Sequence, residues 1–156
     1  MTFTLAQLKA VAAFCRTHGA PHYYRDWSPL VLLEYLNFHA QQDTLQVVAT
    51  GETIQGVATA HRVAAPVIAQ ARAAGKPVFD WTPDDPAAPN LLLGHFIGAE
   101  RGALAALVRC TQARFPNWER LNVFALRTTR GGRQHVRYSV QTIRRLARGN
   151  LKEHYA

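Results

Sequence analysis

The chain has 156 residues, of which 48% are apolar and 18% charged, and this composition fits one globular domain and excludes a disordered protein. No apolar run approaches the roughly 18 residues that a membrane-spanning helix needs, and the N-terminus lacks the pattern of a secretion signal. The net charge is +8, and two distant cysteines, Cys15 and Cys110, give no disulfide framework. We therefore expect a single domain over residues 1–156, with the cytoplasm as its default location.

The first half of the chain predicts helices around a hairpin. A capping-box pattern at Thr4 precedes an apolar helical repeat that ends at Gly19. A serine followed by a proline predicts the start of a second helix over 28–41. The elements expected after it are a hairpin of strands 45–50 and 54–61 and a short helix over 65–74.

The second half predicts a strand, a glycine turn, a helix and another strand in its middle. A proline-rich loop over 80–89 leads to an apolar strand over 90–97, which we expect at the centre of the sheet. The elements expected next are a turn over 98–102, a helix over 103–115, strands over 121–126 and 134–138, and a helix over 140–148. The order of elements predicts an α/β (α+β) domain.

The turn after the central strand is a candidate anion site. A helix begins with free amides and a partial positive charge, and it can therefore bind a phosphate. Glycines would let the backbone approach a pyrophosphate, and an arginine would add charge. The candidate binding residues are Gly98, Arg101, Gly102 and Ala103. A plain connection between a strand and a helix would also place glycine here.

Basic residues gather near the C-terminus. Between residues 127 and 152 there are eight arginines and lysines and no acidic residue. Such a segment attracts anionic partners, which include nucleic acid, a phosphorylated cofactor and an acidic protein. The candidate partner-binding residues are Arg137, Arg144, Arg145 and Arg148. A solvated face that keeps the protein soluble is the simpler interpretation.

The strand, turn and helix resemble the GNAT superfamily, in which this unit holds the pyrophosphate of acyl-CoA. Arg101-Gly102-Ala103 approximates the superfamily's turn, although the spacing differs. The resemblance implies a single GNAT-like domain with a mixed, mostly antiparallel central sheet flanked by helices. It also implies acyl-CoA or acyl carrier protein as the acyl donor.

A closer resemblance is to the RTX-toxin-activating lysine acyltransferases, and it spans about residues 20–148. Tyr24-Arg25-Asp26-Trp27 resembles the family's His-Arg-Asn-Trp segment, and Asp80-Trp81-Thr82, Gly102-Ala103-Leu104 and Phe115-Pro116 resemble its middle section. The catalytic histidine of the family falls on Tyr24. The family's catalytic aspartate, on the central strand, falls on Leu92 or Leu93 in one alignment and on Asp80 in another. The resemblance gives the basic end a role in docking an acidic carrier protein.

Acyl transfer to an amine needs a base with a pKa near neutrality and donors for the oxyanion. The candidates are His22 in the loop between the first two helices, His95 on the central strand, Asp80 as a group that orients one of them, and Tyr24 as an acid for the leaving thiolate. Each has a plainer alternative: an exposed loop histidine, a buried hydrogen-bonded histidine, a turn aspartate and a packing tyrosine. The histidines and cysteines show no zinc-ligand spacing, and we expect no metal.

Three functions remain open from the sequence. The first is an acyltransferase that moves an acyl group from acyl-CoA or acyl carrier protein to an amine, with a protein lysine as one candidate acceptor. The second is a GNAT-like protein of a mobile element that binds or modifies nucleic acid. The third is a non-catalytic basic binding module, which the departures from the family pattern would permit.

Overall fold

The computed structural model describes residues 2–19, 24, 27–74, 81–129 and 132–149, with the backbone only for 70–74, 126–129 and 132–135. The elements in chain order are α1 (Leu5–His18), α3 (Pro29–Gln41), β1 (Leu45–Thr50), β2 (Thr53–Val63), α4 (Ala65–Ala74), β3 (Asn90–Gly98), α5 (Arg101–Arg114), the 3-10 turn η2 (Trp118–Arg120), β4 (Asn122–Thr129), β5 (Gly132–Tyr138) and α6 (Val140–Ala147). No helix within these ranges is both long and apolar enough to cross a membrane.

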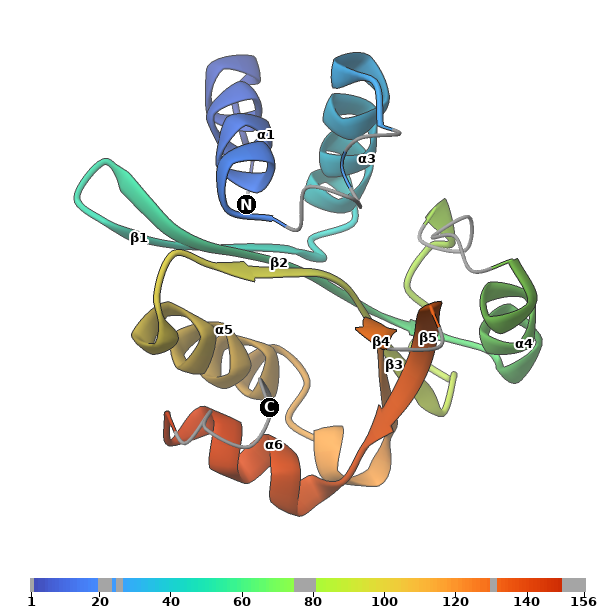
Figure 1. Ribbon diagram of the computed structural model, residues 1–156. Helices are drawn as coiled ribbons and strands as arrows, with labels where there is room; N and C mark the ends of the chain where they lie inside the picture. The colour runs from blue at the N-terminus through green and yellow to red at the C-terminus, as the bar shows by residue number, and fades with distance from the viewer. Residues whose placement is uncertain (1, 20–23, 25–26, 75–80, 130–131, 150–156) are drawn as a thin grey trace.

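A five-stranded sheet with the order β1-β2-β3-β4-β5 forms the middle layer. Neighbouring strands are antiparallel except β3 and β4, which are parallel and joined by the crossover helix α5. Helices α1 and α3 cover one face of the sheet, and α5 and α6 cover the other (Figure 1). The prediction of an α+β fold with a mixed, mostly antiparallel sheet is therefore confirmed.

Side-chain caps explain where three of the helices begin. The capping box of α1 is present, since the Gln7 amide donates to the Thr4 hydroxyl at 3.2 Å and the Thr4 amide donates to the Gln7 side chain at 2.8 Å. The hydroxyls of Ser28 and Ser139 accept in the same way from amides three residues on, each at 3.1 Å. These polar residues fix the helix starts that the sequence predicted.

Four elements differ from the expected ranges by two residues or more, and among them β4 ends three residues later, at Thr129, and β5 begins two residues earlier, at Gly132. Helix α5 begins at Arg101, two residues before the expected start, so that Arg101 and Gly102 belong to its first turn. Strand β2 reaches from Thr53 to Val63 and is longer than the predicted strand over 54–61. The longer strand pairs with both β1 and β3, and this pairing supplies the extra backbone hydrogen bonds.

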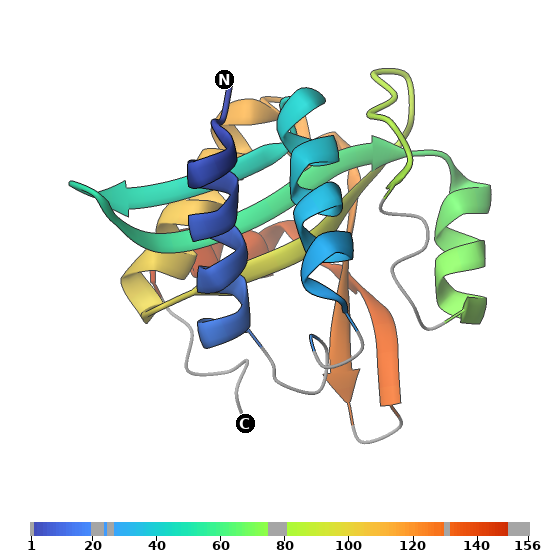
Figure 2. The ribbon, with the colours of Figure 1, turned by 90° about the horizontal axis from the view of Figure 1, so that it is seen from above.

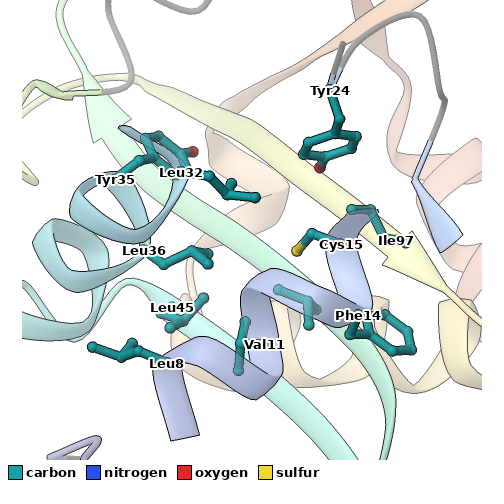
Figure 3. Packing of buried hydrophobic residues seen from close by; sticks show 11 residues of the cluster. Leu8, Val11, Phe14, Cys15, Tyr24, Leu32, Tyr35, Leu36, Leu45 and Ile97 are labelled. Carbon is teal, nitrogen blue, oxygen red and sulfur yellow. The ribbon is translucent and has the colours of Figure 1, made fainter. Parts of the chain in front are cut away.

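Apolar side chains fill both sides of the sheet. Figure 3 shows the packing under α1 and α3, where the buried residues are Leu8, Val11, Phe14, Cys15, Tyr24, Leu32, Tyr35, Leu36, Leu45, Val57 and Ile97. A second cluster under α5 and α6 contains Ala60, Leu91, Val108, Phe115, Trp118, Val123 and Ile143. Burial on both faces explains why β3 reads as a continuous apolar run.

A partly buried ion pair fixes the loop that leads into β3. Asp84 accepts from the Arg62 side chain at 2.5 and 3.1 Å and from the Arg62 amide at 2.7 Å. Only 13% of the Asp84 side chain and 24% of the Arg62 side chain are exposed. The pair therefore holds the loop against the end of β2.

Replacing Asp84 by asparagine should lower the free energy of unfolding by about 1–3 kcal/mol, because two charge-assisted hydrogen bonds are weakened in a partly dry setting. Urea denaturation measures the loss. The matched control is Asp85→Asn, which changes an exposed neighbour and should cost less than about 0.5 kcal/mol. Equal losses in the two variants would contradict the role given to Asp84.

Candidate functional site

Strands β3 and β4 are neighbours for only part of their length. Four residue pairs join them, over 90–93 and 122–125. Beyond these pairs β3 continues to Gly98 alongside β2, and β4 continues to Thr129 alongside β5. Figure 2 shows β4 and β5 projecting away from the line of β3. The carboxyl ends of two parallel strands thus separate, and in open sheets such ends are where ligands bind.

A bulge in β3 lies just beyond the last of these pairs. Thr59 of β2 stands opposite two residues of β3, Gly94 and His95. The extra residue shifts the alternation of side chains, so that His95 and Ile97 face α1 and α3 and Phe96 faces α5. The bulge therefore aims the His95 side chain into the layer between the sheet and the first two helices.

Aromatic rings surround the His95 imidazole. The centre of its ring lies 5.4 Å from the ring centre of Tyr24, 5.6 Å from that of Trp27 and 4.6 Å from that of Tyr35. The His95 backbone amide donates to the Thr59 hydroxyl at 2.9 Å, and the same hydroxyl is hydrogen-bonded to the Tyr35 hydroxyl at 2.8 Å. The main chain and the ring of His95 are thus both fixed by buried partners.

The Tyr24 hydroxyl forms a hydrogen bond with His95 Nδ1. The two residues are 71 positions apart in the sequence, and both were candidates in the sequence analysis. Tyr24 is 6% exposed and His95 2% exposed. Both members of the pair are therefore buried.

Burial holds the pKa of His95 at about 3, below its ordinary value of 6.5, because the dry surroundings disfavour the charged imidazolium. His95 is therefore neutral at physiological pH. A neutral imidazole has one nitrogen that donates a hydrogen bond and one that accepts, so it can orient the phenol. With a pKa of about 3 it is a far weaker base than the near-neutral group that the sequence analysis expected for acyl transfer.

The free energy of unfolding should fall as the pH drops from about 6.5 toward 3, because the unfolded chain binds a proton there that folded His95 does not. Between about pH 7.5 and 4.5 the loss attributable to His95 is about 3 kcal/mol. Urea denaturation at both pH values measures the acid sensitivity, and His95→Leu should reduce it by this amount, leaving any part that belongs to the other buried histidines, His39 and His61. His18→Gln, at the half-exposed end of α1, is the control. A His95→Leu protein as acid-sensitive as the parent would show that other groups cause the effect.

The first turn of α5 follows β3 directly, on the side where β3 and β4 separate. Its N-cap residue, Glu100, makes no capping hydrogen bond through its side chain, whereas α1, α3 and α6 are each capped by a hydroxyl. The first amides of a helix have no partner within the helix. Arg101 is exposed beside them, and Glu100 brings a negative charge to the same turn.

The two glycines at this turn have different surroundings. A Cβ atom on Gly98 would lie 2.8 Å from Leu104 Cγ, so Gly98 is needed for α5 to pack against β3. A Cβ atom on Gly102 would meet only Glu100 Oε1, at 3.8 Å, so the space beside Gly102 is open. Ala103 is buried. Of the four predicted anion-binding residues, Arg101 and Gly102 face solvent, and anion binding itself stays a prediction.

The predicted basic patch is divided between the two faces of the sheet. Arg144 and Arg148 are exposed on α6, and Arg145 is half-buried there. Arg137 pairs with Phe124, which packs toward α4, so Arg137 lies on the opposite face from α6. Arg144 also forms an ion pair with Glu119 at 2.8 Å, and an acidic residue from outside the basic segment therefore offsets part of its charge.

The structure brings together Tyr24 and His95, and the other two catalytic candidates, His22 and Asp80, lie outside the described residues. Sequence reasoning missed Thr59 and Tyr35, which hold the His95 main chain and ring. The available signal for Thr59 was a hydroxyl in the middle of an apolar stretch of β2 that is buried on both faces over residues 56–61, because a buried hydroxyl needs a hydrogen-bond partner.

Within the described ranges, no three or more His, Cys, Asp or Glu side chains lie together in a way that could hold a metal ion. No protein-family model matches the sequence, and no curated protein shows significant similarity to it. The site must therefore be interpreted from its own geometry.

Proposed function

We propose that this protein is a GNAT-like acyltransferase that moves an acyl group from a phosphate-bearing thioester donor, acyl-CoA or acyl carrier protein, to an amine. The separation of β3 and β4 after four residue pairs is the observation that supports this most directly. A donor arm that enters between the strands would place its phosphates at the first turn of α5. Donors of this kind occur in the cytoplasm, and the proposal places the reaction there.

The position of Tyr24 and His95 supports the same proposal. The last β3–β4 pair is Leu93 with Ala125. The bulge that points His95 toward α1 and α3 begins just after this pair. A thioester held between the separating strands would therefore approach the Tyr24–His95 pair. The RTX-toxin-activating enzymes, which the segment around Tyr24 resembles, use a histidine at the Tyr24 position and an acidic residue on the central strand. Here Tyr24 stands at the position of that histidine, whereas the acidic position falls on Leu92, Leu93 or Asp80, and His95 lies on the same strand two residues after Leu93.

The reaction balances with this pair as the route for one proton. The amine nitrogen attacks the thioester carbonyl carbon, the C–N bond forms and the C–S bond breaks. The leaving thiolate takes the phenolic proton of Tyr24, and Tyr24 recovers a proton from the amine nitrogen. The products are an amide and a free thiol. Neutral His95 orients the phenol through their hydrogen bond, and Tyr24 is the catalytic residue because its phenol carries the proton that the thiolate takes.

Thermal denaturation with a panel of acyl-CoAs and acylated carrier proteins tests donor binding. At a donor concentration about 100 times its Kd, binding stabilises the fold by about 2.7 kcal/mol and raises Tm by about 5–10 °C in a chain of this length. If a donor raises Tm, turnover is followed by the release of free thiol in the presence of candidate amines.

Gly102→Asp tests where the phosphate binds. The space beside Gly102 is open, so the new carboxylate should fit, and an acidic side chain in the first turn favours the helix itself. Repulsion should weaken donor binding about tenfold relative to the matched control Gly102→Asn. Isothermal titration calorimetry measures both affinities. Equal affinities would mean that the phosphate does not bind at α5.

Other outcomes of the panel would favour the other functions. If duplex or single-stranded DNA raises Tm and no acyl donor does, with binding that falls steeply as salt rises, the protein binds nucleic acid through its arginines. If both fail while acidic proteins bind, the protein is a basic binding module without this chemistry. Either result overturns the proposed reaction.

A further inference from the structure

Strand β1 is the outermost strand on one side of the sheet (Figure 2). Successive residues of an antiparallel strand direct their backbone groups alternately toward and away from the neighbouring strand. The Ala60 amide of β2 donates to the Thr44 carbonyl at 3.1 Å, so the even-numbered residues of β1 bond to β2 and the backbone groups of Leu45, Val47 and Ala49 point away from it. In the described part of the chain, no backbone hydrogen bond outside the pairing with β2 involves these three residues.

The same edge of the sheet is covered where β1 ends. Strand β2 continues past β1 to Val63, and the loop before β3 lies beside it there. The Arg62 amide donates to Asp84 Oδ1 at 2.7 Å, and the Asp85 amide donates to the Arg62 carbonyl at 3.0 Å. The loop thus takes the place of a further strand beside Arg62, and no described segment forms such backbone bonds with the outer side of β1.

The two outer strands of the sheet differ in composition. Charged side chains and prolines discourage an edge strand from pairing with another sheet. Strand β5 has Arg133 and Arg137, whereas β1, with the sequence Leu-Gln-Val-Val-Ala-Thr, has no charged residue and no proline. The irregularity in the β1–β2 pairing comes from Gln55, an extra residue of β2, so β1 itself stays regular. Strand β1 therefore keeps the geometry and composition of a strand that pairs.

The sequence of β1 is complementary to a second copy of itself. About a twofold axis at Val47, the β1 strands of two copies run antiparallel, so that Val47 faces Val47 of the second copy and Leu45 faces its Ala49. This register uses every residue of β1 whose backbone points outward, with two hydrogen bonds for each facing pair. The side chains that meet are apolar, and no like charges stand opposite each other within the strand.

The same register brings opposite charges together at the two ends of β1. Arg114 of α5 forms an ion pair with Asp43, just before β1, at 3.3 Å, and 41% of the Arg114 side chain is still exposed. The turn at Gly51 and Glu52 of the second copy lies opposite Asp43 in this register, so Glu52 of the second copy approaches Arg114. The twofold axis repeats this contact at the other end of the strand.

We propose that β1 is the docking surface for a second copy of this chain, and that two copies form a homodimer with one continuous sheet across a twofold axis at Val47. The inference does not depend on the proposed acyltransferase function. Because β2 separates β1 from β3 in each copy, the strand that carries His95 is not part of the interface.

Sedimentation equilibrium tests the dimer and the strand that forms it. The parent should change from a monomer of 17.4 kDa to twice this mass as its concentration rises from about 1 to about 200 µM, since an interface of this size is small. Ala49→Lys adds a charge at the exposed end of β1 and should weaken self-association at least about tenfold. Ala10→Lys, which adds the same charge at an exposed position of α1, is the control and should leave it unchanged. A parent that stays monomeric, or an Ala49→Lys protein that dimerises like the parent, overturns the proposal.

A charge exchange tests the register. Arg114→Glu should weaken the dimer about tenfold, because it places a carboxylate beside Glu52 of the second copy. Combining Arg114→Glu with Glu52→Arg should restore the association. Both positions are exposed, so this exchange still decides the question if Ala49→Lys does not fold. A double variant that associates no better than Arg114→Glu overturns the register.

Amide hydrogen exchange, followed by NMR at both ends of the concentration range, identifies the interface residue by residue. The amides of Leu45, Val47 and Ala49 should exchange more slowly at the high concentration. Those of Gln46 and Val48 bond to β2 in the monomer as well and should change much less. A dimer without this alternation forms through another surface, and that result overturns the proposal.

Discussion

If the protein is the proposed acyltransferase, Tyr24→Phe should lower kcat by about two orders of magnitude or more, because it keeps the ring and removes the proton that the proposed reaction gives to the leaving thiolate. The ring still packs against Gly19, where a Cβ atom would overlap it. The free energy of unfolding should therefore fall only by the contribution of the hydrogen bond to His95, about 1 kcal/mol. Steady-state kinetics with the donor that raises Tm most would measure the loss. KM should change little, since the phenol acts mainly in the transition state.

Tyr138→Phe is the matched control for this variant. Tyr138 is half-buried on β5 and packs on the α5 and α6 side of the sheet, away from His95. It should keep the kcat of the parent within about twofold. If Tyr24→Phe matches this control, Tyr24 does not take part in the chemistry, whatever donor the protein binds.

Tyr35→Ala should cause the largest loss of stability, about 3–5 kcal/mol. The Tyr35 side chain is fully buried, and its ring contacts those of Trp27, His39 and His95. Removing it leaves a cavity beneath α3 that its rigid neighbours cannot fill. Urea denaturation at neutral pH measures the loss in the free energy of unfolding.

Two further variants separate the contributions of the Tyr35 ring and hydroxyl. Tyr35→Phe keeps the ring and removes only the hydrogen bond to Thr59. The free energy of unfolding should fall by no more than about 1 kcal/mol, because the Thr59 hydroxyl still accepts from the His95 amide. Leu30→Ala changes a residue of the same helix that is 64% exposed and should cost less than about 0.5 kcal/mol. A Tyr35→Ala protein as stable as Leu30→Ala would contradict the packing described for this layer.

The elements that the sequence predicted well are those fixed by neighbouring residues. The Thr4 capping box, the serine before Pro29 and the glycine at 149 act within a few positions, and each marks a helix end in the structure. Gly149 has φ +83°, the left-handed conformation that ends a helix. Local rules of this kind are readable from one sequence.

The candidate site was only partly predictable because long-range pairing forms it. Tyr24 and His95 are individually reasonable candidates, but their contact spans 71 positions and depends on the register of β2 and β3. The bulge opposite Thr59 changes which side chains of β3 face α3. A period-two pattern cannot reveal this shift, because an apolar strand buried on both faces has no polar alternation to interrupt.

The basic segment shows the same limit for charge. Its arginines form one block in the sequence, yet pairing with Phe124 sends Arg137 to one face of the sheet while α6 places Arg144 on the other. A strand followed by a helix separates charges that are neighbours along the chain. Which arginines share one surface can therefore be decided only after the register of the sheet is known.

The short contact between β3 and β4 divides the sheet into a three-stranded part and a hairpin. Hydrogen-exchange units in proteins often follow such divisions, with each part opening at its own free energy. The β4–β5 hairpin, joined to the rest by four residue pairs and by α5, should open before β1–β3. A ligand bound between the two parts would couple their opening. Amide hydrogen exchange would then become slower even in strands that do not contact the ligand.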